Sequence, residues 1–321
     1  MTAETDTAPS AGLRAETVRT LEAAGLDVPD VLRAVRGALD EDFRYGPDVT
    51  SAATVAGRTV AADVVAREAG VVAGLQVALA VLDLIEDYFD RPADLPGAES
   101  GPGATGTALV ADGTRVRAGD AVLRVSGHAV AVLGAERTML NFLTHLSGIA
   151  SATREWADAV AGTGAVIRDT RKTLPGLRAL EKYAVRCGGG ENHRMGLGDA
   201  ALVKDNHVAA AGGVTAAVRA VRAYAAPGLV IEVECDSVDQ VREALTAGAR
   251  FILLDNMPVP VLLEAVAVAR EYDGVRLEAS GGLRLGNARE VAATGVDYLA
   301  VGGLTHSSRA LDLGLDYQGA R

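Results

Sequence analysis

After Arg137 the chain repeats one pattern six times: a short apolar run ends in a polar or glycine-rich cluster, and a helical segment follows. The runs end about 21 to 35 residues apart and occupy residues 165–169, 201–204, 230–234, 251–255, 275–280 and 299–303. This alternation predicts parallel strands joined by crossover helices. Such strands either close into a barrel or form an open doubly wound sheet, and in both folds the working residues lie at the carboxyl ends of the strands.

The position of the glycines favours the barrel. An open nucleotide-binding sheet usually has a glycine-rich loop after its first strand, and none follows the first run here. The glycine clusters follow the last two runs instead, as Ser280-Gly281-Gly282 and Gly302-Gly303. At these places (β/α) barrels commonly hold a phosphate with backbone N–H groups and helix N-termini. We therefore predict an α/β protein with a barrel of about six parallel strands.

The residues before the first run show a mixed pattern, and a chain of 321 residues suits two domains. Helical periodicity covers residues 28–39 and 75–88, and strand-like alternation covers residues 59–67 and 121–125. Residues 116–120 predict a turn between two strands, and residues 91–106, rich in Pro and Gly, predict a loop. This half is expected to be a sheet packed against helices.

Composition excludes several classes of protein. A net charge of -11 argues against a nucleic-acid partner, because such binding depends on positive charge that neutralises phosphates. The longest apolar stretch, residues 71–85, contains Gln76 and Asp83 and is shorter than the roughly 20 residues that span a bilayer. Cys187 and Cys235 form no CxxC pair, and no signal-peptide pattern opens the chain, so we expect a cytoplasmic protein without membrane insertion.

One segment reverses the charge of the whole chain. Residues 168–207 contain eight basic residues against five acidic ones, a net charge of 8 − 5 = +3, which suits an anionic small molecule. Arg171 and Lys172 immediately follow a predicted strand, which directs them toward the mouth of the barrel. Arg178, Lys182 and Arg186 recur every four residues, and for these we expect a solvated helix face instead.

Two further groups are candidates for the same mouth. Gly188-Gly189-Gly190 gives the backbone freedom beside His193 and Arg194, which suit carboxylate binding. Glu234 and Asp255 each close a strand, and two carboxylates among phosphate binders suggest Mg²⁺, held together with substrate oxygens and waters. The same acids could accept hydrogen bonds from ribose hydroxyls. The alternative is a pair of structural salt bridges with barrel arginines.

At this point the sequence resembles a known family. The runs EDFRYGPDVTS, ERTMLNFLTHLSGIAS, DTRKTLPGLRALEKYAVRCGGGENHRMGLGDAALVKDNHV, VEC, LLDN, EASGGL and VGGLTHS are similar to the signatures of quinolinate phosphoribosyltransferases, in the same order. The resemblance covers most of the chain, from about residue 26 to 315. It departs mildly at Leu174, where the family often has Thr, and at Val49, where Leu is usual.

The resemblance implies an N-terminal α/β sandwich, an incomplete (β/α) barrel and a homodimer, or a higher oligomer, with shared active sites. The expected boundaries are a disordered tail at 1–12, the sandwich at 13–134 joined by 306–321, and the barrel at 135–305. The implied quinolinate-binding residues are Arg137 from the neighbouring subunit, Arg171, His193, Arg194 and Lys204. The implied phosphoribosyl pyrophosphate residues are Thr170, Lys172, Glu234, Asp255, Ser280, Gly281, Gly282, Val301, Gly302, Gly303 and His306.

The implied reaction needs only Mg²⁺ as a cofactor. Quinolinate attacks phosphoribosyl pyrophosphate, pyrophosphate leaves, and the resulting pyridinium loses carbon dioxide to give nicotinate mononucleotide. Lys172, Lys204, Glu234 and Asp255 are the implied catalytic residues, whereas both cysteines are expected to be packing residues. Two alternatives remain: a related phosphoribosyltransferase that uses nicotinate or another pyridine acid, and a non-catalytic anion-binding protein of the same fold.

Overall fold

The computed structural model describes residues 12–89 and 103–318, which form two compact units. Unit 1 contains residues up to Ser151, then Pro175–Cys187 and the residues from Arg309 onward, and unit 2 contains Ala152–Leu174 and Gly188–Ser308. The boundary predicted between residues 134 and 135 therefore differs from the division seen here, which falls within a long helix and gives one later helix to unit 1. Residues 1–11 of the predicted tail lie outside the described residues.

Unit 1 is built on a four-stranded antiparallel sheet of order β12-β1-β5-β3. The strands are β1 (Thr59–Ala66), β3 (Ala104–Ala108), β5 (Ala121–His128) and β12 (Leu313–Tyr317), with β2 (Gly70–Val71) and β4 (Arg115–Val116) as a separate pair. The strands predicted at 59–67 and 121–125 and the turn at 116–120 are confirmed. The loop predicted at 91–106 lies outside the described residues up to 102, and its end is wrong because β3 begins at Ala104.

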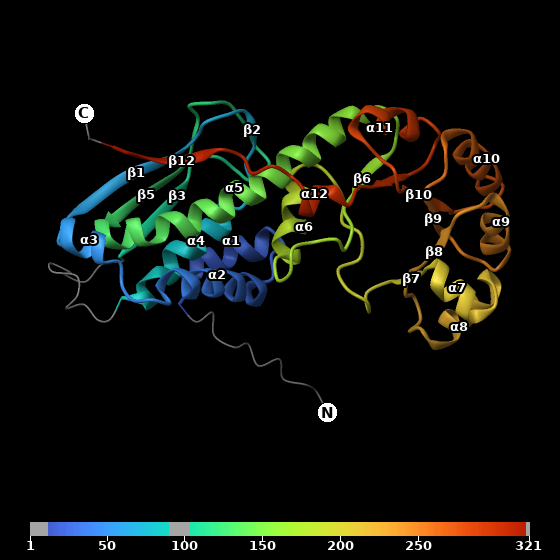
Figure 1. Cartoon of the computed structure of the whole chain (residues 1–321), viewed down its shortest axis with the longest axis horizontal. Helices are drawn as coiled ribbons and strands as arrows, with labels where there is room; N and C mark the ends of the chain where they lie inside the picture. Colours follow the sequence, from blue (N-terminus) through green and yellow to red (C-terminus); the bar gives the residue numbers. More distant parts are fainter. Residues whose placement is uncertain (1–11, 90–102, 319–321) are drawn as a thin grey trace. The chain divides into compact units, whose positions relative to one another are not determined.

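Seven helical elements accompany this sheet among the described residues: α1 (Ala15–Ala23), α2 (Val28–Phe43), α3 (Val49–Thr54), α4 (Leu75–Leu84), the 3₁₀ turn η1 (Ile85–Tyr88), most of α5 (Ala129–Ala159) and α6 (Arg178–Cys187). Figure 1 shows α4 between the sheet and the pair α1 and α2, and α4 packs against all three. The apolar stretch at 71–85 thus forms the core of unit 1. None of the described helices is long and apolar enough to cross a membrane.

Helix α6 corrects one prediction. The prediction that the face of Arg178, Lys182 and Arg186 lies in solvent is confirmed for Arg186, which is exposed, and is wrong for Lys182, which is 0% exposed. All six residues from Leu180 to Val185 are buried, so the helix is covered around most of its circumference rather than on one stripe. The buried Glu181 hydrogen-bonds His145 at 2.9 Å. The four-residue spacing of the charges did not show that the helix is covered.

Unit 2 contains a six-stranded parallel sheet of order β6-β11-β10-β9-β8-β7. Its strands match all six predicted runs: β6 (Val166–Arg168), β7 (Ala201–Val203), β8 (Ile231–Cys235), β9 (Phe251–Asp255), β10 (Arg276–Ser280) and β11 (Tyr298–Ala300). The first strand of the unit pairs with the last, as in a sheet that rolls into a barrel. Strands β6 and β7 do not pair, and a bridge between Arg168 and Glu191 lies on the free side of β6. The prediction of an incomplete barrel is confirmed.

Helices follow the strands as the crossover pattern predicts. They are α7 (Asp205–Ala211), α8 (Val214–Tyr224), α9 (Val238–Thr246), α10 (Val259–Ala269), α11 (Leu285–Ala292) and α12 (Gly303–His306). In Figure 1, α9 and α10 lie outside the strands of this unit, and α8, α9, α10 and α11 pack in sequence against one another. The helices between parallel strands return the chain to the amino end of the next strand, so the strand-to-helix loops lie at one end of the barrel.

Candidate active site

The carboxyl ends of the six parallel strands carry every predicted site residue of unit 2 except one pair. Thr170, Arg171 and Lys172 follow β6, Lys204 follows β7, Glu234 and Asp255 lie at the ends of β8 and β9, Ser280, Gly281 and Gly282 close β10, and Val301, Gly302, Gly303 and His306 follow β11. The exceptions are His193 and Arg194, which follow the bridge at Glu191. Arg137 lies on α5 in unit 1.

Arg171 and Arg194 form a pair of like charges. Burial lowers the pKa of Arg194, and the positive charge of Arg171 lowers it further. One Nη of Arg194 donates to the carbonyl oxygen of Ala200 at 3.0 Å. Its buried Nε has no acceptor within the described part of the chain. Two neighbouring guanidinium groups, one with an unused donor, suit an anion that offers several oxygens.

Lys204, Glu234 and Asp255 form a second group. The Lys204 Nζ lies 3.6 Å from a carboxylate oxygen of Glu234. Burial, the largest effect, raises the pKa of Glu234; the charge of Lys204 opposes this rise, and the carboxylates of Asp255 and Asp205 add to it. The effect of Asp255 on Glu234 shows that the structure brings the two predicted acids together. Their negative charge exceeds what Lys204 offsets, which suits a cation or donor hydroxyl groups.

Lys172 connects the first and last loops of the barrel. Its backbone N–H donates to Thr170 Oγ1 at 3.0 Å, and its carbonyl oxygen accepts from Thr305 Oγ1 at 2.9 Å. A Cβ at position 302 would lie 3.0 Å from Lys172 Cδ, so glycine at 302 leaves room for the lysine stem. The strand pairing of β6 with β11 thereby places Lys172 beside a predicted phosphate loop.

The loop after β10 packs closely on Asn256, a residue that the sequence did not single out. Gly281 has a φ of +85°, and a Cβ there would overlap the Asn256 side chain. Asn256 itself has a φ of 54° and donates from Nδ2 to Asp255 at 2.8 Å. The loop and the end of β9 therefore hold each other in place. His306, by contrast, shares a hydrogen bond with its neighbour Ser307 at 2.7 Å.

Replacing Gly281 with alanine should lower the free energy of unfolding by about 1–3 kcal/mol, because the new side chain would face both an unfavourable φ and Asn256. Denaturant unfolding followed by circular dichroism measures this change. Gly286→Ala is the matched control, since that glycine lies in α11 with nothing within 4 Å of an added Cβ. An equal effect of the two substitutions would contradict the close packing at Gly281.

Three buried acidic residues beneath the site were missed: Asp169, Glu232 and Glu278. Asp169 accepts from the His193 backbone N–H at 2.8 Å and from Asn192 Nδ2 at 2.6 Å. Glu278 accepts from Arg168 at 2.7 Å, and Glu232 lies 2.8 Å from His193 Nε2. Glu232 precedes Glu234 by two residues, so both side chains lie on one face of β8. This two-residue spacing was the available signal.

The raised pKa of Glu278 should make the stability of the fold depend on pH. Burial, followed by the charge of Glu232, raises the pKa of Glu278 from 4.5 to about 7, while the guanidinium of Arg168 opposes the rise. Because folding raises the pKa of this carboxyl group, the folded protein holds the proton more tightly than the unfolded chain does. The contribution of Glu278 to stability is therefore full below pH 4.5 and is lost as the pH rises to about 7. The shift corresponds to about 3 kcal/mol.

A glutamine at position 278 cannot ionise and isolates this effect from that of other acids. Between pH 5 and pH 8, the stability of wild type should therefore fall relative to Glu278→Gln by up to about 3 kcal/mol. Urea unfolding of both proteins across this range measures the difference. A difference that is constant with pH would show that Glu278 does not titrate there.

The two cysteines have no place in this chemistry. Cys187 and Cys235 are both free thiols. Burial is the main cause that raises the pKa of each to about 12. At neutral pH they are therefore protonated and unreactive, as the prediction of packing residues requires.

The chain matches two family models over most of its described length. The model described as "Quinolinate phosphoribosyl transferase, N-terminal domain" matches residues 48–147. The model described as "Quinolinate phosphoribosyl transferase, C-terminal domain" matches residues 149–316. The two matches together cover more than half of the chain.

Curated relatives and a solved structure point to the same family. The carboxylating nicotinate-nucleotide pyrophosphorylase of Mycobacterium leprae is 55% identical over 289 residues, which is 88% of this chain and 95% of that protein. A probable enzyme of the same name from Bacillus subtilis is 37% identical over 276 residues, covering 86% and 89% of the two chains. The structure of nicotinate-nucleotide pyrophosphorylase from Francisella tularensis has a TM-score of 0.81 and 35% identity, and covers 90% of this chain and 96% of that one.

Proposed function

Because the chain belongs to the quinolinate phosphoribosyl transferase family, we propose that it joins quinolinate to phosphoribosyl pyrophosphate and makes nicotinate mononucleotide, carbon dioxide and pyrophosphate. The observation that carries this proposal is the pair of like charges Arg171 and Arg194, in which burial and then the charge of Arg171 lower the pKa of Arg194. An anion with two adjacent carboxylates, such as quinolinate, would relieve that repulsion.

The cations would orient the pyridine ring. Arg171, Arg194 and Lys204 would hold the two carboxylates of quinolinate, so that the ring nitrogen faces the anomeric carbon of the second substrate. The bond from that carbon to pyrophosphate breaks, and a bond to the ring nitrogen forms. Positive charge develops on the ribose as the pyrophosphate leaves, and Glu234 and Asp255 would stabilise it.

Decarboxylation then needs no further group from the protein. The ring nitrogen has become a cationic pyridinium, which accepts the electron pair released when the neighbouring carboxylate leaves as carbon dioxide. A proton replaces the lost carboxylate on the ring carbon. Lys172, held beside Gly302, would offset the charge of the departing pyrophosphate.

Mg²⁺ remains part of the proposal, with Glu234 and Asp255 as its protein ligands. Burial is the main cause that raises the pKa of Glu234, and the carboxylates of Asp255 and Asp205 add to the rise; this negative charge beside Glu234 supports a cation there. Mg²⁺ is usually bound by one or two carboxylates together with substrate phosphate oxygens, so two acids suffice. When bound, the ion would neutralise charge on the pyrophosphate group.

We also propose that the protein is a homodimer in which Arg137 completes the site of the neighbouring subunit. Arg137 is exposed on α5 in the single chain, which leaves its guanidinium available to a partner. We also propose a cytoplasmic location, because Cys187 and Cys235 are free thiols and the cytoplasm keeps thiols reduced.

One assay tests the function. The purified protein is incubated with quinolinate, phosphoribosyl pyrophosphate and Mg²⁺, and the release of carbon dioxide and nicotinate mononucleotide is measured. We expect the two products in equal amounts, and no mononucleotide when nicotinate replaces quinolinate. Product from nicotinate would favour the related phosphoribosyltransferase, and no product from either acid would favour a non-catalytic anion-binding protein.

A further inference from the structure

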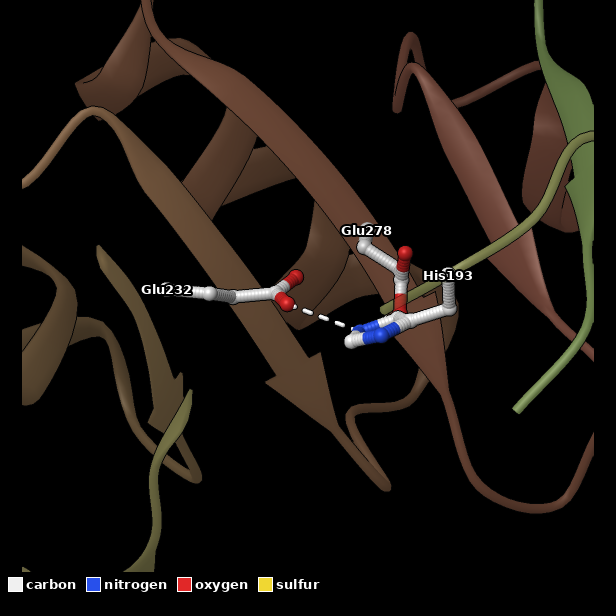
Figure 2. A group of neighbouring side chains, drawn as sticks. All are labelled: His193, Glu232 and Glu278. Carbon is white, nitrogen blue, oxygen red and sulfur yellow. Dashed lines mark ion pairs between the residues drawn. The ribbon is translucent and has the colours of Figure 1, made fainter. Parts of the chain in front are cut away.

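A network of buried charged side chains lies within the barrel, beneath the proposed quinolinate site. In Figure 2 the carboxylate of Glu232 of β8 faces the ring of His193, and Glu278 of β10 lies beside the same ring. His193 Nε2 lies 2.8 Å from Glu232 and 3.6 Å from Glu278, and Arg168 of β6 donates to Glu278 at 2.7 Å. Strands β6, β8 and β10 are not neighbours in the sheet, so these contacts cross the interior of the barrel.

The hydrogen bonds of His193 fix its protonation. The backbone N–H of Arg194 donates to His193 Nδ1 at 2.7 Å, and a backbone N–H can only donate. Nδ1 therefore carries no proton, and the proton of the neutral ring is on Nε2, where it points to the carboxylate of Glu232. In this arrangement the ring is neutral, and both of its nitrogens are engaged with the protein.

This geometry argues against a metal ion, although His193, Glu232 and Glu278 place three ligand atoms within 4.8 Å of one another. A histidine that binds a metal through Nε2 almost always donates from Nδ1, whereas Nδ1 accepts here. The guanidinium of Arg168 also contacts Glu278 directly and would repel a cation. The network is better explained as a hydrogen-bonded support.

We propose that Glu232 and Glu278 are positioning residues, which hold His193 as the neutral Nε2–H tautomer so that its Nδ1 fixes the main chain of Arg194. This inference rests on the proposed function, in which Arg194 binds quinolinate. It assigns His193 to the support of that arginine, instead of to direct binding of a substrate carboxylate as a cation.

Other contacts hold the same segment. Asp169, which is fully buried, accepts from the backbone N–H of His193 and from the side chain of Asn192. Arg194 is then held at its far end by the carbonyl oxygen of Ala200. The loop that carries Arg194 is thus fixed on both sides of His193, and its guanidinium is prepared for an anion before one binds.

The two glutamates have different tasks in this network. Glu232 accepts a hydrogen bond from the Nε2–H group of His193. Glu278 lies near the same nitrogen without a hydrogen bond to it, and Arg168 donates to Glu278. Burial and the charge of Glu232 raise the pKa of Glu278 to about 7, so that the pair does not carry two full negative charges at neutral pH. Arg168 in turn lies over the ring of Tyr298, 4.4 Å from its centre.

A direct measurement of the tautomer tests the proposal without substrate. The chain has five histidines, so ¹⁵N NMR of the imidazole nitrogens is tractable, and the His193→Asn spectrum identifies the signals of His193. We expect an unprotonated Nδ1 and a protonated Nε2 at pH 8. An imidazolium or the Nδ1–H tautomer would overturn the proposal, even if the carbon dioxide assay succeeds.

Kinetics of two matched variants give the second test. Asparagine at 193 can place an acceptor where Nδ1 lies, whereas glutamine reaches Glu232 but has no group at the Nδ1 position. We expect His193→Gln to raise the KM for quinolinate about tenfold and His193→Asn to raise it less, with little change in kcat or in the KM for phosphoribosyl pyrophosphate. Equal rises as large as that of Arg194→Ala would show that the ring binds substrate directly, and would overturn the proposal.

Glu232 provides a test by conservative rescue. Glutamine at 232 still offers an oxygen to His193 Nε2, whereas leucine fills the space without an acceptor. The KM for quinolinate should rise about tenfold in Glu232→Leu and clearly less in Glu232→Gln, with folding checked by circular dichroism. Equal values in the two variants would contradict the positioning role, and the activity of wild type separately tests the proposed function.

Discussion

Replacing Arg171 with alanine should lower kcat/KM for quinolinate by about 10³-fold, because it removes a two-pronged donor to a desolvated carboxylate. Steady-state kinetics with quinolinate as the varied substrate measures this loss. Arg171→Lys keeps the charge but loses the planar fork, and we expect an intermediate loss of about 10- to 100-fold. The ranking of wild type, lysine and alanine thus separates the role of geometry from that of charge.

The same substitution should leave the fold intact. Burial is the main cause that lowers the pKa of Arg194, and the charge of Arg171 lowers it further, so the removal of Arg171 relieves one repulsion. The melting temperature of Arg171→Ala should therefore stay close to that of wild type. Arg219→Ala, an exposed change on α8, serves as the control for activity. Wild-type turnover in Arg171→Ala would refute the assignment of this site.

Mixing two inactive variants, Arg137→Ala and Lys204→Ala, should restore activity to about a quarter of the wild-type level. In a statistical mixture, half of the dimers are heterodimers, and one of the two sites in each would have both residues intact. The calculation holds only if Arg137 serves the neighbouring subunit. Activity is measured after subunit exchange, which brief dilution promotes.

The control for this experiment is a mixture of Arg194→Ala and Lys204→Ala proteins. The proposal places both of these residues in the site of one chain. Each site of their heterodimer would lack one cation, so no recovery is expected. If subunit exchange is proven by mass spectrometry and the first mixture stays inactive, Arg137 does not complete a shared site.

The strands of the barrel could be predicted from the sequence, because each combines an apolar run with a polar end. Arg171, Lys172, Glu234 and Asp255 lie next to such runs, so their shared location follows from the rule that parallel strands end on one side. Their contacts support that placement. Local pattern and topology agree for these residues.

The network beneath the site could not be predicted in the same way. Glu232 and Glu278 lie inside apolar strands, and a spacing of two residues shows that a side chain shares a face with the site but not whether that face is inside a barrel or under a helix. Lys182 presents a related difficulty, because charge spacing on a helix does not reveal what covers it. Long-range packing decides both cases.

The order of the strands has a consequence for synthesis of the protein. Lys172 is fixed by Thr305, which is 133 residues later in the chain, and Arg67 at the end of β1 pairs with Asp316 of β12, which is 249 residues later. Neither the loop after β6 nor the antiparallel sheet is complete until a ribosome has made almost the whole chain. A prematurely terminated polypeptide would therefore carry the cations of the site without the strand that holds them, and proteases should remove it readily.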